Sequence, residues 1–433
     1  MRFLHNIGQG IIRIVSRFDI FNLGNSVALV YFGTFLLAPI LVYLGIHFRF
    51  EWLGYHISNK IFFLIFGGLV AFIIGYANPF TRKLVMRIRN PLRGVWDNVR
   101  AKRMFVLIFI LGIGVKLVRI FFGGYGHLTI SDAFAKSPFY SLFGILDWLG
   151  YFAIGIAFLM YFRLLKEHDP AARVWRWIAW GALSLELVYA IPSCSRLAVV
   201  APLLFYIIPR WYVWKKNYLG LFLAFLFVAV IVFPLGNVCR NKSLIGFYTV
   251  SQYNENSLAV SKSFLENFLY RLDQATYFSR VTERIEPSYR LNVLKDFLVS
   301  AGPPRFLWKQ KPAIYGDGNK LGHELGVLYP DDTVTSIGRT ILGDWYLNFG
   351  TWGVIFGMLF MGILWRAIYE FLIIGSGVSA SGILFYIPVW IYVLQGLQDR
   401  VGSIYGGLFK ILVMFSILQF FLKTMSNHSK NYS

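Results

Sequence analysis

Apolar runs as long as a bilayer is thick are the feature that most limits what this chain can fold into. Residues 26–46 and 218–236 reach the roughly 20 apolar residues that a helix needs to cross a membrane. Of the 433 residues, 57% are hydrophobic and only 15% are charged, against about 25% in soluble domains. We therefore expect an all-α polytopic membrane protein.

Positive charge is concentrated in short loops between these runs. The formal net charge is +21, and residues 82–103 hold eight Lys or Arg against one acid, Asp97. Short basic loops stay on the cytoplasmic side, where they meet anionic headgroups. The charge therefore indicates topology, with membrane lipids as partners, and we expect no nucleic acid.

Placing every basic loop on one side gives about ten transmembrane helices and both termini in the cytoplasm. The first run lacks a small-residue cleavage site, so we expect it to remain a span. Residues 367–381 fit a segment along the inner interface. The expected spans are residues 26–46, 61–76, 104–122, 140–165, 177–193, a run from Leu197, 218–236, 341–365, 383–397 and 404–422.

One long polar segment interrupts the spans and divides the chain into three parts. Residues 1–236 hold about seven spans, residues 237–340 form the external loop region, and residues 341–433 hold about three spans. The loop region has thirteen basic and ten acidic residues, and helical spacing recurs in residues 258–281 and 289–298. We expect residues 302–338 to be an ordered loop, because Pro and Gly are dense there.

Several cations stand at the expected outer ends of the spans. Arg196 lies in a turn with almost no loop, where an arginine favours either an anion or snorkelling to the interface. Lys116 and Arg119 share one helix face, which fits snorkelling or a role in substrate binding. Arg400 follows Asp399, so a structural Asp–Arg role and substrate binding stay open.

The loop region carries a stiff cationic and aromatic stretch, residues 304–312, with the sequence Pro-Arg-Phe-Leu-Trp-Lys-Gln-Lys-Pro. Flanking prolines restrict its backbone, and Arg and Lys bind phosphate. The alternative is an interfacial anchor built from Trp308 and the lysines.

Groups that can accept a proton follow this stretch: His323, Glu324, the pair Asp331–Asp332, and Asp344. Asp344 begins an apolar span, where a lone charge is unfavourable, and Arg339 is a possible partner for it. No Cys/His cluster has metal-ligand spacing, and we expect Cys194 and Cys239 to be unpaired. We therefore expect no cofactor.

Three features together resemble a known family. They are the 304–312 stretch, the Ser-Arg turn at Arg196, and Gly-Asp-Trp-Tyr-Leu-Asn-Phe-Gly at residues 343–350. The chain is similar to the O-antigen and exopolysaccharide repeat-unit polymerases of the Wzy type, over roughly residues 193–357. Where that family usually has Trp-Pro before the lysine of its first motif, this chain has Lys309-Gln310.

The resemblance implies a glycosyltransferase of the C class in the bacterial cytoplasmic membrane, with its active site on the external face. Such an enzyme joins oligosaccharide repeat units carried on undecaprenyl diphosphate without metal, alongside a protein that regulates chain length. The candidate catalytic residues are His323, Glu324 and Asp344. The candidate diphosphate ligands are Arg196, Arg305, Arg339 and Lys311. The candidate substrate contacts are Arg119, Arg271, Trp308, Tyr346 and Arg400.

Two other functions share these features. An O-antigen ligase uses the same donor in the same compartment but transfers glycan to lipid A-core. A transporter of lipid-linked oligosaccharide predicts charges distributed along several spans around a pathway, whereas here the external segment is the charged part.

Overall fold

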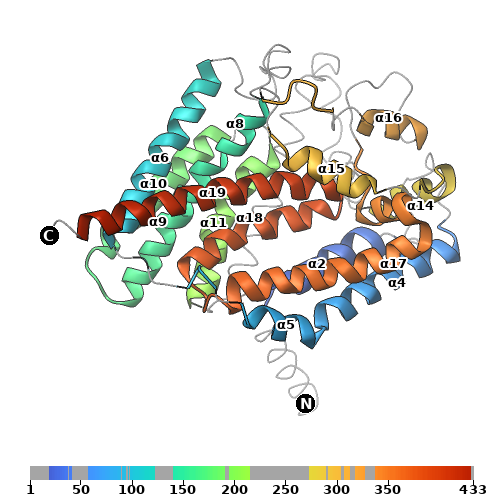
Figure 1. The fold of residues 1–433 in the computed structure, drawn as a ribbon, viewed down its shortest axis with the longest axis horizontal. Helices are drawn as coiled ribbons and strands as arrows, with labels where there is room; N and C mark the ends of the chain where they lie inside the picture. Colours follow the sequence, from blue (N-terminus) through green and yellow to red (C-terminus); the bar gives the residue numbers. More distant parts are fainter. Residues whose placement is uncertain are drawn as a thin grey trace, which may run out of the picture.

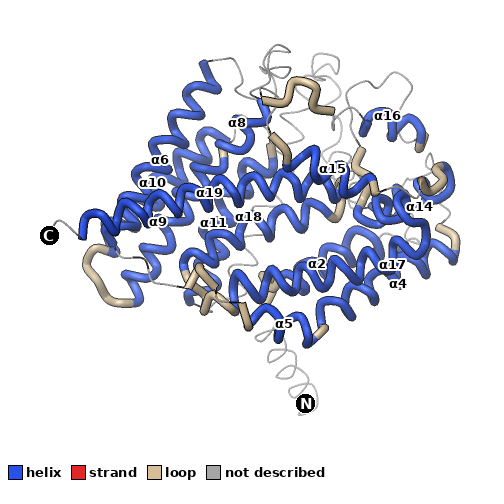
Figure 2. Tube along the Cα trace, viewed as in Figure 1, coloured by secondary structure: helices blue, strands red, loops and turns tan. Residues whose placement is uncertain are grey.

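The structure, a computed structural model, describes residues 19–37, 39–40, 57–88, 90–93, 96, 98–121, 140–190, 195–214, 273–288, 291–303, 307–312, 317–326 and 337–430. Within these residues every regular element is a helix, as Figure 2 shows. The N-terminal helices are α2 (Leu23–Tyr31), η1 (Phe32–Leu36), α4 (Asn59–Ala77), α5 (Pro79–Met86), α6 (Asn98–Phe121), α8 (Tyr140–Leu146), α9 (Trp148–Lys166), α10 (Ala172–Ala190) and α11 (Arg196–Trp214). The remaining helices are α14 (Gln274–Arg284), α15 (Asn292–Ala301), α16 (Asp317–Glu324), α17 (Ile341–Tyr369), η5 (Glu370–Ile374), α18 (Ala380–Gly396) and α19 (Val401–Lys430).

Five helical stretches in the described part are long and apolar enough to cross a membrane. They cover Asn59–Met86, Asn98–Phe121, Leu142–Lys166, Leu197–Trp214 and Ile341–Ile374. Three shorter apolar helices are Leu23–Leu36, Ala380–Gly396 and Val401–Ile417. The all-α prediction is confirmed for the described residues. The expected count of ten spans is not established, and the expected span at 218–236 lies outside the described residues.

The helices form two groups joined by a central pair. In Figure 1, α6, α9 and α10 bundle at one end, while α2, α4 and α17 lie together at the other. Between them run α18 and α19, and α11 contacts both α9 and α18. The elements α14, α15 and α16 gather on the side away from α5 and from the loop that joins α9 to α10.

Glycine allows α4 and α17 to pack closely. A Cβ atom at Gly75 would lie 2.2 Å from the Leu359 carbonyl oxygen, and one at Gly362 would lie 2.3 Å from that of Phe72. Small residues that let backbones touch are the usual basis of helix association in membranes. The part of α17 that follows residue 350 therefore packs backbone against backbone on α4.

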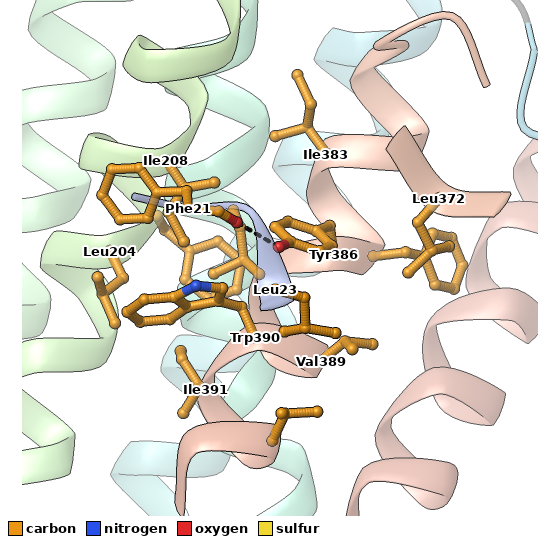
Figure 3. Close-up of a cluster of buried hydrophobic side chains, with 14 of the residues drawn as sticks. Phe21, Leu23, Leu204, Ile208, Leu372, Ile383, Tyr386, Val389, Trp390 and Ile391 are labelled. Atoms are coloured by element: carbon orange, nitrogen blue, oxygen red, sulfur yellow. Dashed lines mark hydrogen bonds between the residues drawn. The ribbon is translucent and has the colours of Figure 1, made fainter. Parts of the chain in front are cut away.

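Figure 3 shows a part of the core in which side chains of α18 and α11 meet Phe21 and Leu23. Phe21 stacks edge-on against Trp211, and its carbonyl oxygen accepts a hydrogen bond from the Tyr386 hydroxyl. The Trp390 Nε1–H donates to Ser26 Oγ over 2.8 Å. Tyr386 and Trp390 thus each have a partner for their buried donor, as burial in an apolar core favours.

The loop region is partly helical, as expected, with differences in detail. Residues 258–272 lie outside the described part, and α14 begins at Gln274. Residues 302–338, predicted to be a loop, contain the short helix α16. Two segments outside the loop region also differ in detail. Residues 140–165, predicted to be one span, form α8 and α9, which meet at Asp147 and together give the spanning stretch Leu142–Lys166. Residues 367–374 continue α17 through the π-helical turn η5, residues 375–379 form a turn, and Ala380 and Ser381 begin α18, so no separate segment forms there.

Candidate functional site

The candidate site lies where the N-terminal ends of α17 and α19 meet. Residues 337–340 pack against the turn between α18 and α19, so closely that a Cβ atom at Gly338 would lie 2.2 Å from the Gln398 carbonyl oxygen. The Ile341 N–H donates to the Leu397 carbonyl oxygen over 3.1 Å. This packing brings Arg339 and Arg400, 61 positions apart in the sequence, to the same place.

Asp344 is the centre of the site. It is only 2% exposed, and its Oδ2 accepts a 2.7 Å hydrogen bond from the N–H of Val401, the first residue of α19. Its Oδ1 lies 4.0 Å from Arg339 Nη1, and Arg400 is also within Coulombic range. A carboxylate at a helix N-terminus meets unpaired N–H groups and the positive end of the helix dipole. Asp344 therefore holds α19 in place and has the partner that the sequence suggested.

The backbone beside Arg339 is strained. Thr340 has φ 61° and ψ 156°, a region that is essentially reserved for glycine and costs about 1–3 kcal/mol. Its Oγ1 accepts from the Gly343 N–H over 3.1 Å and caps α17. Strain that the surrounding structure enforces is common at functional sites, and here it lies next to Arg339 at the start of α17.

The Gly-Asp-Trp-Tyr-Leu-Asn-Phe-Gly motif forms a short helical segment with a break after it. Phe349 (φ −144°, ψ 15°) and Gly350 (φ 65°, ψ −152°) leave helical geometry, so the span predicted at 341–365 is broken near its start. The Asn348 side chain ties the segment before the break to α15. Its Nδ2 donates to the Asp344 carbonyl oxygen over 2.7 Å, and its Oδ1 accepts from Val293 N–H over 3.2 Å.

Asp296, which the sequence analysis did not select, also borders the site. It is half-buried on α15. A Cβ atom placed on Gly402 would lie 2.8 Å from the Cβ atom of Asp296, and the Asp296 carboxylate is within Coulombic range of Asp344. The helix pair α15 and α19 brings it there, and Ser300 Oγ donates to the Ser403 carbonyl oxygen over 2.9 Å. Only this pairing of distant segments reveals Asp296, because no local motif surrounds it.

The two other proposed catalytic residues, His323 and Glu324, stand on α16 beside the site. Leu325 is buried against Leu347 of α17, and the Ile337 N–H donates to the Gly318 carbonyl oxygen over 3.2 Å. His323 is half-buried, and Glu324 is exposed with its Oε1 3.8 Å from Lys320 Nζ. The structure thus brings α16 to the first turns of α17.

The predicted ligands Lys311 and Trp308 lie at the far end of α15. Lys311 Nζ donates to the carbonyl oxygens of Gly302 and Pro303 over 3.2 and 3.0 Å, and lies 5.8 Å from the Trp308 ring centroid. A lysine in this place satisfies carbonyls at the end of a helix. Both residues therefore shape the loop that follows α15.

The remaining predicted residues are dispersed. Tyr346 meets the ring of Phe278 edge-on at 6.2 Å, and Arg119 pairs with Asp147 between α6 and α9. Arg196 is the first residue of α11, and nothing is described of its side chain. Arg271, Arg305, Asp331 and Asp332 lie outside the described residues, as do both cysteines.

The helices α6, α9 and α10 hold charges that pair inside the helix bundle. Lys116 is only 7% exposed and pairs with Glu186, which is 5% exposed, so it turns inward instead of snorkelling. Glu186 was missed, although a lone acid within an apolar run such as Leu-Glu-Leu is a signal for a buried partner. Within the described residues, no group of three His, Cys, Asp or Glu side chains could hold a metal ion.

Comparison with known proteins places the chain in a family whose function is unknown. No curated protein and no solved structure matches the chain. One family model, described as "Domain of unknown function (DUF8712)", matches residues 170–386, from the start of α10 into α18. Because the match covers half of the chain, this protein belongs to that family.

Proposed function

We propose that this protein is a glycosyltransferase that joins oligosaccharide repeat units carried on a membrane lipid diphosphate, undecaprenyl diphosphate. The observation that carries the proposal is the convergence of Arg339 and Arg400 on the buried Asp344, at the meeting point of α17 and α19. Arginine binds diphosphate through two parallel hydrogen bonds, and a broken helix and a strained residue beside it are typical of a binding site in a membrane protein.

The chemistry requires neutralisation of a leaving group. As the bond between the anomeric carbon and the diphosphate oxygen breaks, negative charge grows on the diphosphate, and fixed guanidinium groups stabilise it. Arg339 is suited to this role because its side chain is 20% exposed and lies 4.0 Å from Asp344. Asp344, bonded to the start of α19, positions the arginines.

The acceptor hydroxyl needs a base within hydrogen-bond reach to take its proton. His323 and Glu324 on α16 remain candidates, and half-buried Asp296 on α15 joins them. A single displacement of this kind inverts the anomeric carbon. We assign no metal and no other cofactor to the reaction.

The proposed location is the cytoplasmic membrane of a bacterium, with both termini inside and the site outside. Figure 1 supports opposite placement of α16 and of the loop between α9 and α10. Single cysteines at Lys320 on α16 and at Glu167 after α9, both exposed, test it. An impermeant maleimide should label Lys320→Cys in intact spheroplasts and Glu167→Cys only after lysis; the reverse pattern refutes this topology.

The decisive functional experiment compares the surface glycan of cells with and without the gene. A polymerase predicts that a ladder of repeat units collapses to single units when the gene is removed and returns when it is restored. The carrier of the product separates the two enzymes: long glycan on undecaprenyl diphosphate identifies a polymerase, and glycan lost only from lipid A-core identifies a ligase. A polymerase also predicts a separate chain-length regulator as partner.

One observation favours the transporter as a second candidate. The buried Lys116–Glu186 pair places charges inside the helices, as a transport pathway would. Proteoliposomes with a fluorescent lipid-linked oligosaccharide separate the two, because a transporter exposes the label to external quencher without forming a glycosidic bond.

A further inference from the structure

The helix α15 lies beside the first turns of α19 and runs in the same direction. A Cβ atom at Gly402 would lie 2.8 Å from the Cβ atom of Asp296, and one at Gly406 would lie 2.4 Å from that of Ser300. Both contacts advance by four residues, so the two helices are parallel, and Figure 1 shows them side by side. Small residues with this spacing are common where helices meet in membranes.

The opposite side of α15 carries exposed leucines. Leu291, Leu294 and Leu298 are 62%, 49% and 58% exposed, and their spacing of three and four residues puts them on one side of the helix. We call these three side chains the leucine face. With ten residues, α15 is too short to cross a bilayer, so the leucine face is not the surface of a span.

The leucine face continues the apolar surface of α19. Phe409 of α19 is 49% exposed, and its ring meets that of Phe297 edge-on at 6.1 Å. Phe297 lies three residues after Leu294, on the adjoining side of α15. Since α19 is apolar from Val401 to Ile417, the surface that reaches the leucine face through Phe297 is that of an apolar helix in a membrane protein.

Polar and aromatic side chains border the leucine face as they do at a membrane surface. Lys295 is exposed beside it, and Trp308 and Lys309 are exposed in the loop after α15. Trp and Lys are typical of headgroup depth. Lys311 Nζ donates to two carbonyl oxygens at the end of α15, which supplies hydrogen bonds that backbone next to hydrocarbon requires.

We infer that α15 is an interfacial helix whose leucine face lies among the acyl chains of bilayer phospholipid, in the leaflet that surrounds the start of α19. The apolar side chains match the acyl chains, and Lys295 and Lys309 match the phosphates of the headgroups. Asp296, which borders the candidate site, stands on the other side of the same short helix. The site is thus one helix width from lipid, so a lipid-linked substrate reaches it without leaving the bilayer. Only this last clause rests on the proposed function.

The test is electron paramagnetic resonance of spin-labelled single cysteines in nanodiscs of phosphatidylethanolamine and phosphatidylglycerol, with both native cysteines replaced by serine. Collisions with oxygen report lipid, and collisions with a water-soluble nickel chelate report water. The ratio of the two rates at Leu298→Cys should match that at Phe356→Cys, a 60% exposed position in the spanning part of α17. It should exceed the ratio at Lys320→Cys, which is exposed on α16. A ratio equal to that at Lys320→Cys, or shielding from both reagents by protein, overturns the inference.

A second measurement uses the unaltered chain and so does not depend on the folding of any variant. Phospholipid with a photoreactive diazirine in its acyl chain should label the tryptic peptide 296–305, which contains Leu298, as well as peptide 340–366 of α17. Labelling of peptide 340–366 without peptide 296–305 also overturns the inference. Neither measurement requires activity, so lipid contact at α15 in a protein that forms no polymer would reject the polymerase and keep the interfacial helix.

Discussion

The two polar clusters use the same residue types in opposite ways. Among α6, α9 and α10, each cation is bonded to a carboxylate, and Lys116 and Glu186 are almost fully buried. At the junction of α17 and α19, the Asp344 carboxylate is bonded to a backbone N–H, while Arg339 stays 4.0 Å away and partly exposed. Matched, buried charges hold helices in register, whereas we propose that the partly exposed Arg339 side chain also binds the substrate.

The largest expected effect tests the matched pair. Lys116→Met leaves Glu186 as a buried charge without its cation, and should lower the free energy of unfolding by about 3–5 kcal/mol. Lys116→Met/Glu186→Leu should recover the stability of the parent or exceed it. Thermal unfolding of the purified protein measures both. Equal stability of the parent and the single variant would show that the pair is not buried as described.

The next effect tests the arginine at the junction. Arg339→Lys keeps the charge but loses the planar fork that binds two oxygens, and should slow polymer formation about a hundredfold, which is about 3 kcal/mol in the transition state. Polymer length at matched protein abundance is the measurement. Arg163→Lys is the control, since it changes a partly exposed arginine on α9 that pairs with Glu167 and donates to the Trp96 carbonyl oxygen. Full-length glycan from Arg339→Lys would remove the support for this mechanism.

A smaller effect tests the break in α17. Gly350→Ala forces a side chain into a backbone region that only glycine adopts easily, and should cost about 1–3 kcal/mol of stability. Gly181→Ala is the matched control, since a Cβ atom there meets nothing within 4 Å and alanine favours the helix by about 1 kcal/mol. If both variants unfold at the same temperature, the break does not exist in the folded protein.

The last prediction is that removal of divalent metal ions has no effect on activity. If arginines alone neutralise the diphosphate at the junction, then EDTA should leave the rate of polymer formation by the purified protein unchanged. Activity lost in EDTA and restored by magnesium would place a metal ion at the site, with Asp331 and Asp332 as the first ligands to test.

Local patterns predicted the helices well and the charged contacts poorly. Hydrophobic length located α4, α11, α17 and α18 to within a few residues, because crossing a bilayer demands a continuous apolar run. The same runs could not show that Lys116 turns inward, since its partner Glu186 is 70 positions away. A lysine that snorkels to the interface and a lysine that pairs with another helix give the same pattern in the sequence of their own helix.

The candidate site was predictable in part for a physical reason. Asp344 and Arg339 are five positions apart, so an unfavourable charge and its partner could be seen together in the sequence. Asp296 and the capping of α19 by Asp344 depend on how α15, α17 and α19 meet, and only packing decides that. The polymerase function, its partners and the role of each residue stay predictions.

The break at Phe349 and Gly350 has a mechanical consequence. The short segment before it is anchored to the loop region, where the Ser288 N–H donates to the Leu347 carbonyl oxygen over 2.8 Å and Asn348 bonds to Val293. The long segment after it packs on α4 through Gly362. A change in bilayer thickness tilts transmembrane helices, and we expect the non-helical residues Phe349 and Gly350 to let the long segment tilt without the short one. Arg339 and Asp344, which both precede the break, should then keep their spacing.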